Sequence, residues 1–245
     1  MTQHLSDLPA EVREALDSFV QAAKDAFESD LLSVVLFGSA AEGKLRATSD
    51  VNTLLVLKRF EAARADRLRE PLRLAHAAVQ LDAMFLLESE AEAAIEAFAV
   101  KFADIQARHR VLFGVDPFAH AHAPRDALIR RLRQVLLNLQ LRLRERYVML
   151  SLREEQLAQV IADAASPLRA SAASLLQLEG RPAMMPKEAL AELAREFDDP
   201  KLAAAITEIS TARAAGALEP GQASATLMNL IELTQRLRER VERLQ

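Results

Sequence analysis

Polar side chains that could bind phosphate and a metal ion lie between two apolar runs in the segment LFGSAAEGKLRATSDVNTLLVL. Gly38 and Ser39 follow the first run, and Asp50 opens the second. Asn52 comes two residues later, so in a strand it would project from the same face as Asp50. Two oxygen-bearing side chains on one face, beside a turn that can approach phosphate, suit Mg²⁺, which takes carboxylate and phosphate oxygens.

The Gly-Ser turn is predicted to be a phosphate cradle. Gly38 allows the backbone to approach a ligand closely, and a short helix expected after Ser39 would direct unpaired N–H groups at an anion. The Ser39 hydroxyl would add a donor. Lys44 and Arg46 lie between this turn and Asp50, where they could contact a triphosphate or equally be surface charges.

Strands and helices must hold these residues in place. Continuous apolar runs and polar–apolar alternation predict strands at 31–37, 51–57, 79–87 and 98–105. Apolar residues at three- and four-residue spacing and helix-forming composition predict helices at 7–28, 61–77 and 88–97. The N-terminal part is therefore expected to be an αβ domain over residues 1–122.

The remainder, residues 123–245, is expected to be an all-α helical bundle, which makes the whole chain α+β. The boundary is placed in HAHAPRD, residues 120–126, where His120 and His122 could form a metal pair but are better explained as linker residues. Pro167 is expected to kink or break the second helix of the bundle. The predicted helices are 128–147, 153–178, 187–197, 200–215 and 222–244.

Composition narrows the class of protein. The net charge is −4, with −6 on residues 1–122 and +2 on residues 123–245, so solvated helix faces are favoured over a nucleic-acid-binding surface. The absence of cysteine excludes disulfides and thiolate metal sites and fits a reducing compartment. No signal peptide and no membrane-length apolar run are recognised, so a cytoplasmic protein without membrane partners is expected.

The segment 36–57 resembles the signature of the nucleotidyltransferase superfamily related to DNA polymerase beta, which is a Gly-Ser turn followed by Asp-x-Asp. GSAAEGKLRATSDVN is especially similar to the small bacterial members, which include the kanamycin and streptomycin/spectinomycin adenylyltransferases. Those proteins pair the catalytic domain with a C-terminal helical bundle, and the predicted layout here is similar. The resemblance is specific in motif only over 36–57 and elsewhere concerns the layout.

The resemblance implies transfer of a nucleoside monophosphate from a nucleoside triphosphate to a hydroxyl, with two Mg²⁺ ions held by three carboxylates. Asp50 matches the first carboxylate, and Asn52 stands where the second belongs. The third position has two candidates, Lys101 in FAVKF, which is the favoured alignment, and Asp82 in VQLDAMF. Lys101 could pair with Asp50 or bind phosphate as a point charge. If Asp82 is the third carboxylate instead, Asn52 is the one substituted position and slow catalysis is possible.

The leading hypothesis is a nucleotidyltransferase-fold protein that binds a nucleotide or a related phosphate ligand and is impaired in catalysis. Its expected partners are a nucleoside triphosphate, Mg²⁺ if the protein is active, and an unidentified small-molecule or protein acceptor. The alternative is a non-catalytic interaction or sensor protein, in which the bundle and its apolar final helix form a homodimer or partner surface. A third hypothesis, an antibiotic-modifying enzyme, is disfavoured by Asn52.

Overall fold

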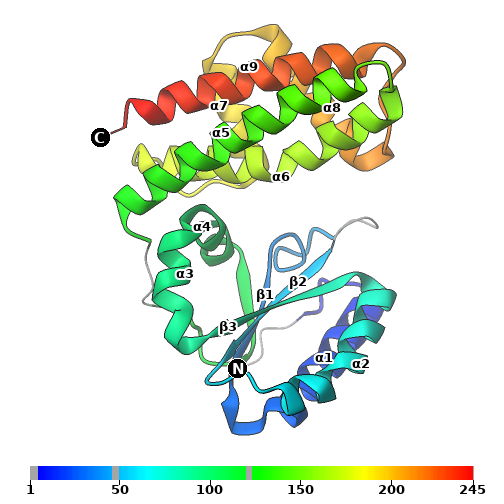
Figure 1. Ribbon diagram of the computed structural model, residues 1–245, viewed down its shortest axis with the longest axis vertical. Helices are drawn as coiled ribbons and strands as arrows, with labels where there is room; N and C mark the ends of the chain where they lie inside the picture. The colour runs from blue at the N-terminus through cyan, green and yellow to red at the C-terminus, as the bar shows by residue number, and fades with distance from the viewer. Residues whose placement is uncertain (1–4, 46–49, 120–122, 245) are drawn as a thin grey trace. The chain divides into compact units, whose positions relative to one another are not determined.

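The computed structural model describes residues 5–45, 50–119 and 123–244. The chain is α+β and divides into two compact units, Met1–Ala97 with Phe102–Ala123 and Phe98–Lys101 with Pro124–Gln245 (Figure 1). The domain boundary is predicted after residue 122, and residues 120–122 lie outside the described part of the chain. The predicted pair of His120 and His122 falls within that segment.

The first unit is built on a four-stranded sheet in the order β3-β2-β1-β4 (Figure 1). Its strands are β1 Leu31–Phe37, β2 Val51–Leu57, β3 Leu81–Leu87 and β4 His109–Gly114. β1 pairs antiparallel with both β2 and β4, whereas β2 pairs parallel with β3. A parallel pair needs a crossover, which helix α2 (Ala62–Val79) supplies. The end of β1 and the beginnings of the other three strands therefore meet at one end of the sheet.

Helices cover both faces of this sheet. Alternation along β2 sends Leu55 into one apolar cluster and Leu54 into another. The first cluster includes Phe19 of α1 (Ala10–Phe27) and Leu68 of α2. The second includes residues of α3 (Ala91–Ala97) and Phe102 of α4 (Ala99–Ala107). Short 3₁₀ turns, η1 Glu28–Asp30 and η2 Glu88–Glu90, precede β1 and α3.

The second unit is helical, as the apolar periodicity predicts. Its helices are α5 Arg125–Leu150, α6 Glu154–Leu178, α7 Pro186–Glu196, α8 Pro200–Ala215 and α9 Gln222–Glu242. α6 contacts all the others and continues through Pro167 without a break. No helix in the described part of the chain is both long and apolar enough to cross a membrane.

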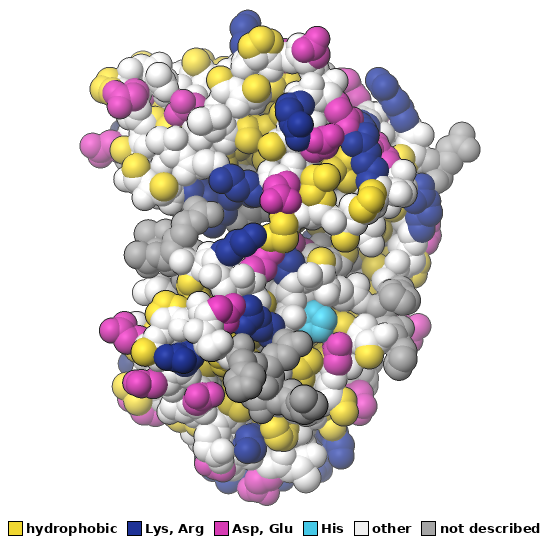
Figure 2. Space-filling view, turned by 180° about the vertical axis from the view of Figure 1, so that it is seen from behind, with side chains coloured by type: hydrophobic (Ala, Val, Ile, Leu, Met, Phe, Trp, Pro, Cys, Tyr) yellow, Lys and Arg dark blue, Asp and Glu magenta, His cyan; other side chains and the backbone are white. Residues whose placement is uncertain are grey.

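Ion pairs connect helices of the second unit. Arg240 of α9 reaches Glu179 at the end of α6 at 2.6 Å and Glu196 of α7 at 2.6 Å. Arg236, also on α9, pairs with Asp199 before α8 at 2.9 Å. On the face seen in Figure 2, basic and acidic side chains are interspersed. This pattern is typical of solvated helices that pair their charges.

The strand predicted at 98–105 is wrong, because residues 99–105 belong to helix α4. Ala99, Phe102 and Ile105 are all buried at three-residue spacing, while Phe98 is 47% exposed. That is the burial pattern of a helix face rather than of a strand. The strand of this region is instead β4, for which the sequence analysis predicts no strand.

The short helix predicted after Ser39 is also wrong. Residues 38–43 form consecutive turns, and no helix begins within 38–45; residues 46–49 lie outside the described part. The turns join two antiparallel strands, so the chain has only to reverse direction here. Any anion site at this point must therefore use loop N–H groups instead of a helix N-terminus.

Candidate functional site

The predicted site residues of the first unit lie at one end of the sheet. Gly38 and Ser39 follow β1, Asp50 immediately precedes β2, and Asn52 and Asp82 are the second residues of β2 and β3. The register pairs Asn52 with Asp82. The strand pairing thus brings together residues that are 30 positions apart in the chain.

Asn52 and Asp82 project from the same face of the sheet. Leu54 in β2 and Leu86 in β3 both pack in the apolar cluster that contains Phe102, and side chains at even spacing along a strand share a face. Neighbouring strands lie about 4.8 Å apart. The Thr53 hydroxyl donates to the Asp82 carbonyl at 3.0 Å and helps to fix this register. The two polar side chains therefore start from neighbouring positions on one face of the sheet.

The donors at this position fit a single Mg²⁺ that also binds phosphate. Asp50 is exposed and Asn52 half-buried, and Asn52 Nδ2 donates to the Asp50 carbonyl at 3.4 Å. Two carboxylates with phosphate oxygens are a common Mg²⁺ environment. Across the described ranges, no group of three or more His, Cys, Asp or Glu side chains could hold a metal. Asp50, Asn52 and Asp82 together supply two carboxylates, which is one fewer than the three that the resemblance implies for two ions.

In the described part of the loop after β1, several consecutive backbone N–H groups make no hydrogen bond of good geometry. The Gly38 N–H donates to the Arg108 carbonyl at 3.0 Å, and the N–H groups of Gly43 and Lys44 bond back within the loop at 3.1 and 2.9 Å. Those of Ser39–Glu42 make no hydrogen bond of good geometry to any described residue. Successive free N–H groups in a turn can bind an anion. Gly38 has φ +77°, a conformation that favours glycine.

Arg108, which lies between α4 and β4, contacts this loop. Its guanidinium pairs with Asp104 of α4 and lies 3.4 Å from Glu42 Oε2. Burial by itself would lower the pKa of Arg108, but hydrogen bonds and charges from Asp104 and Glu42 outweigh burial and raise that pKa. The guanidinium therefore stays charged, and the loop carboxylate of Glu42 is held.

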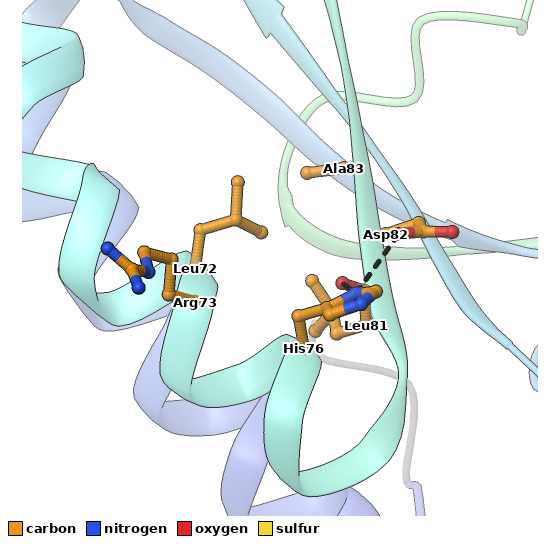
Figure 3. Close-up of a pocket in the computed structure, with 6 residues that line it drawn as sticks. All are labelled: Leu72, Arg73, His76, Leu81, Asp82 and Ala83. Atoms are coloured by element: carbon orange, nitrogen blue, oxygen red, sulfur yellow. Dashed lines mark hydrogen bonds and ion pairs between the residues drawn. The ribbon is translucent and has the colours of Figure 1, made fainter.

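His76 is a site residue that the sequence analysis missed. It lies in the last turn of α2, and its Nδ1 is 3.2 Å from Asp82 Oδ1 and 3.1 Å from the Leu81 carbonyl (Figure 3). Because both neighbours are acceptors, Nδ1 carries a proton. An open pocket of about 360 Å³ adjoins this pair, lined by Leu72, Arg73, His76, Leu81, Asp82 and Ala83. No spacing rule links His76 to Asp82, because only the packing of α2 against β3 brings them together.

The two lysines predicted to bind nucleotide, Lys44 and Lys101, lie in different units of the chain. Lys44 is exposed at the end of the 38–43 turns, and Arg46 lies outside the described residues. Lys101 is exposed on α4 and groups with the second unit. The strand that would place it at the third carboxylate position is absent, whereas Asp82 does lie on a strand that pairs with β2. The preference for Lys101 over Asp82 at that position therefore loses its structural basis.

Comparisons with known proteins find, among others, a short match in sequence and a long match in structure. No model of a known protein family matches the chain. A Methanocaldococcus jannaschii protein, provisionally named a protein adenylyltransferase, is 44% identical over 52 residues, which are 21% of this chain and 35% of that protein. The spectinomycin adenyltransferase of Enterococcus faecialis, solved with ATP and spectinomycin, matches with a TM-score of 0.63 over 94% of this chain and 99% of that chain.

The long match has 11% sequence identity and therefore shows the fold alone. The short match spans about a third of its relative and adds likeness in sequence. The long match covers both the four-stranded αβ unit and the helical bundle seen here. The predicted resemblance to nucleotidyltransferases is thereby confirmed at the level of the fold, and likeness in sequence to a protein named as an adenylyltransferase extends over 52 residues.

Proposed function

We propose that the first unit binds a nucleoside triphosphate together with one Mg²⁺. Asp50 and Asp82 would supply carboxylates and Asn52 a neutral amide oxygen. The unpaired N–H groups of Ser39–Glu42 and the Ser39 hydroxyl would bind phosphate oxygens, and Lys44 would add positive charge. The register that sets Asn52 beside Asp82, next to the free N–H groups, carries this proposal.

Transfer of a nucleoside monophosphate to a hydroxyl acceptor would be slow or lost. Bound Mg²⁺ neutralises phosphate charge and can activate an attacking oxygen. With Asn52 in place of a carboxylate, the formal charge of the three positions is −2 rather than −3, so a second ion would be held weakly. The names of the two related proteins indicate two acceptor classes to try, an aminocyclitol such as spectinomycin and a protein hydroxyl.

Lys101 is proposed as a phosphate contact only in the alternative in which nucleotide binds without Mg²⁺. The effect of a Lys101 variant on nucleotide binding distinguishes this alternative from Mg²⁺-dependent binding. Substitution of Lys101 by Ala should leave Mg²⁺-dependent binding unchanged, whereas it should weaken binding that is independent of Mg²⁺.

Calorimetric titration with ATP, GTP, CTP and UTP, with and without Mg²⁺, tests the proposal. Wild-type binding should require Mg²⁺ and should be strongly weakened in Asp50→Asn and Asp82→Asn. Asp17→Asn, which neutralises an exposed carboxylate on α1, is the matched control and should bind normally. Failure of all four nucleotides to bind would refute the proposed function.

A second candidate function is a non-catalytic interaction through the helical bundle, with a second copy of the chain as partner. The apolar final helix does not supply the surface, because Leu230, Leu233 and Leu237 of α9 are buried in the bundle. α5 instead exposes apolar side chains at helical spacing opposite its core face: Leu137 is 42%, Leu141 55% and Val148 80% exposed.

Sedimentation of the full chain over a wide concentration range tests this candidate. A reversible dimer that Val148→Glu abolishes would support it. Leu74→Glu changes a 62% exposed leucine on α2 instead and should not affect association. A wild-type chain that stays monomeric at every concentration would exclude the bundle as a homodimer surface.

A further inference from the structure

A bidentate ion pair lies against the loop of residues 38–45 and does not belong to the sequence motif. Asp7 precedes α1, and Arg110 is the second residue of β4. Arg110 Nη1 donates to Asp7 Oδ1 at 2.7 Å, and Arg110 Nη2 donates to Asp7 Oδ2. Paired hydrogen bonds between guanidinium and carboxylate restrict the geometry of both groups. The pair therefore holds the segment before α1 against β4.

Gly43 is where this pair meets the loop. Its φ is +69°, a conformation that L side chains rarely adopt. A Cβ at this position would overlap the Asp7 carboxylate. The carboxylate therefore packs directly on the loop backbone, and a larger residue at position 43 would displace it.

Arg108 holds the same loop at other points. Its carbonyl accepts the Gly38 N–H, and its guanidinium contacts Glu42. With Asp7 against Gly43, the loop is thus restrained at its first residue and at two later ones. The N–H groups of Ser39–Glu42 lie between these restraints and make no hydrogen bond of good geometry to any described residue.

We infer that Asp7 and Arg110 are positioning residues for the phosphate site, because they hold the loop in the conformation that leaves these N–H groups free. The inference rests on the proposed nucleotide binding and adds two residues from outside the motif. A loop already held in its binding conformation loses less conformational entropy when phosphate binds. Without the pair, the loop would sample other conformations and affinity would fall, while the metal ligands stayed in place.

Two measurements on the full chain test the inference. Hydrogen exchange without ligand reports the order of the loop, because the N–H groups of Gly43 and Lys44 bond within it. Asp7→Asn and Arg110→Gln should each speed exchange at these two amides. Titration with MgATP should show affinity about tenfold lower, or about 1.4 kcal/mol, with the dependence on Mg²⁺ retained.

Matched variants separate positioning from general damage. Asp7→Glu keeps the carboxylate and should retain most of the affinity. Asp66→Asn removes the exposed ion pair to Arg69 on α2 and should change neither measurement. Two independent variants of the same pair guard against one that fails to fold.

The outcomes are distinguishable. Loop exchange and MgATP affinity that both match the wild type in Asp7→Asn and Arg110→Gln would overturn the inference and leave the proposed function standing. Faster exchange with unchanged affinity would overturn it as well, because the loop order would then not serve binding. A wild-type chain that binds no nucleotide would overturn the proposed function and this inference together.

Discussion

The substitution Asn52→Asp tests the reasoning about the metal site most directly. Asn52 lies between the loop of residues 38–45 and Asp82, and the strand register pairs Asn52 with Asp82. The amide and the carboxylate have nearly the same shape, so the change adds charge without altering packing. The new carboxylate should strengthen Mg²⁺ binding and should cost stability when Mg²⁺ is absent.

Both effects can be estimated from Coulomb's law. Unit charges 4 Å apart interact by about 1 kcal/mol in water, so a divalent ion and the new carboxylate gain about 2 kcal/mol. That gain corresponds to roughly thirtyfold tighter Mg²⁺ binding. Without Mg²⁺, the new carboxylate faces that of Asp82 across about 4.8 Å between strands. The repulsion costs about 1 kcal/mol, or about 2–4 °C in Tm for a chain of this length.

Calorimetry with MgCl₂ in the presence of ATP measures the first effect, and thermal melts in EDTA and in Mg²⁺ measure the second. Asn138→Asp is the matched control, since it makes the same chemical change at an exposed position of α5 and should be neutral in both assays. If Asn52→Asp leaves Mg²⁺ affinity unchanged, and its Tm is insensitive to Mg²⁺, the residues at 50, 52 and 82 do not form a metal site.

Three further outcomes are expected. Asp82→Asn should lower the Mg²⁺-dependent affinity for ATP at least about tenfold, since Asp50 would be the last carboxylate at the site; equal affinity in calorimetry would remove Asp82 from it. Leu54→Ala should lower the free energy of unfolding by about 3 kcal/mol in urea denaturation, because the side chain is fully buried; an unchanged midpoint would contradict that packing. The hydrogen bond from Arg110 lowers the pKa of Asp7, so the ion pair stabilises the fold above about pH 4 and that contribution is lost as pH falls through the folded-state pKa. The difference in unfolding free energy between wild type and Asp7→Asn should therefore shrink as the pH falls from about 4 through the lowered folded-state pKa, and a constant difference would show that the Asp7 charge does not matter.

Local pattern was sufficient for several features. β1 and β2 begin and end where their continuous apolar runs do, because buried strands need apolar side chains on both faces. The two-residue period placed Asn52 on one face with Asp50, and three- and four-residue spacing predicted each bundle helix. These properties depend on neighbours within one element, so the sequence alone could determine them.

Short apolar segments are where local pattern misled. FAVKFADI fits the two-residue period of a strand and also the period of a helix. It forms α4, because Phe102 and Ile105 bury together from one helix face. The Gly-Ser turn likewise fits either a helix start or a tight reversal. The antiparallel pairing of β1 with β2 selects the reversal.

Contacts between elements were decided only by the tertiary structure. The register of β2 on β3 sets Asp82 beside Asn52, and the packing of α2 brings His76 to Asp82. The pair of Asp7 and Arg110 joins residues from opposite ends of the first unit. Such contacts depend on how separately formed elements align and pack, and no spacing within a single helix or strand encodes that alignment.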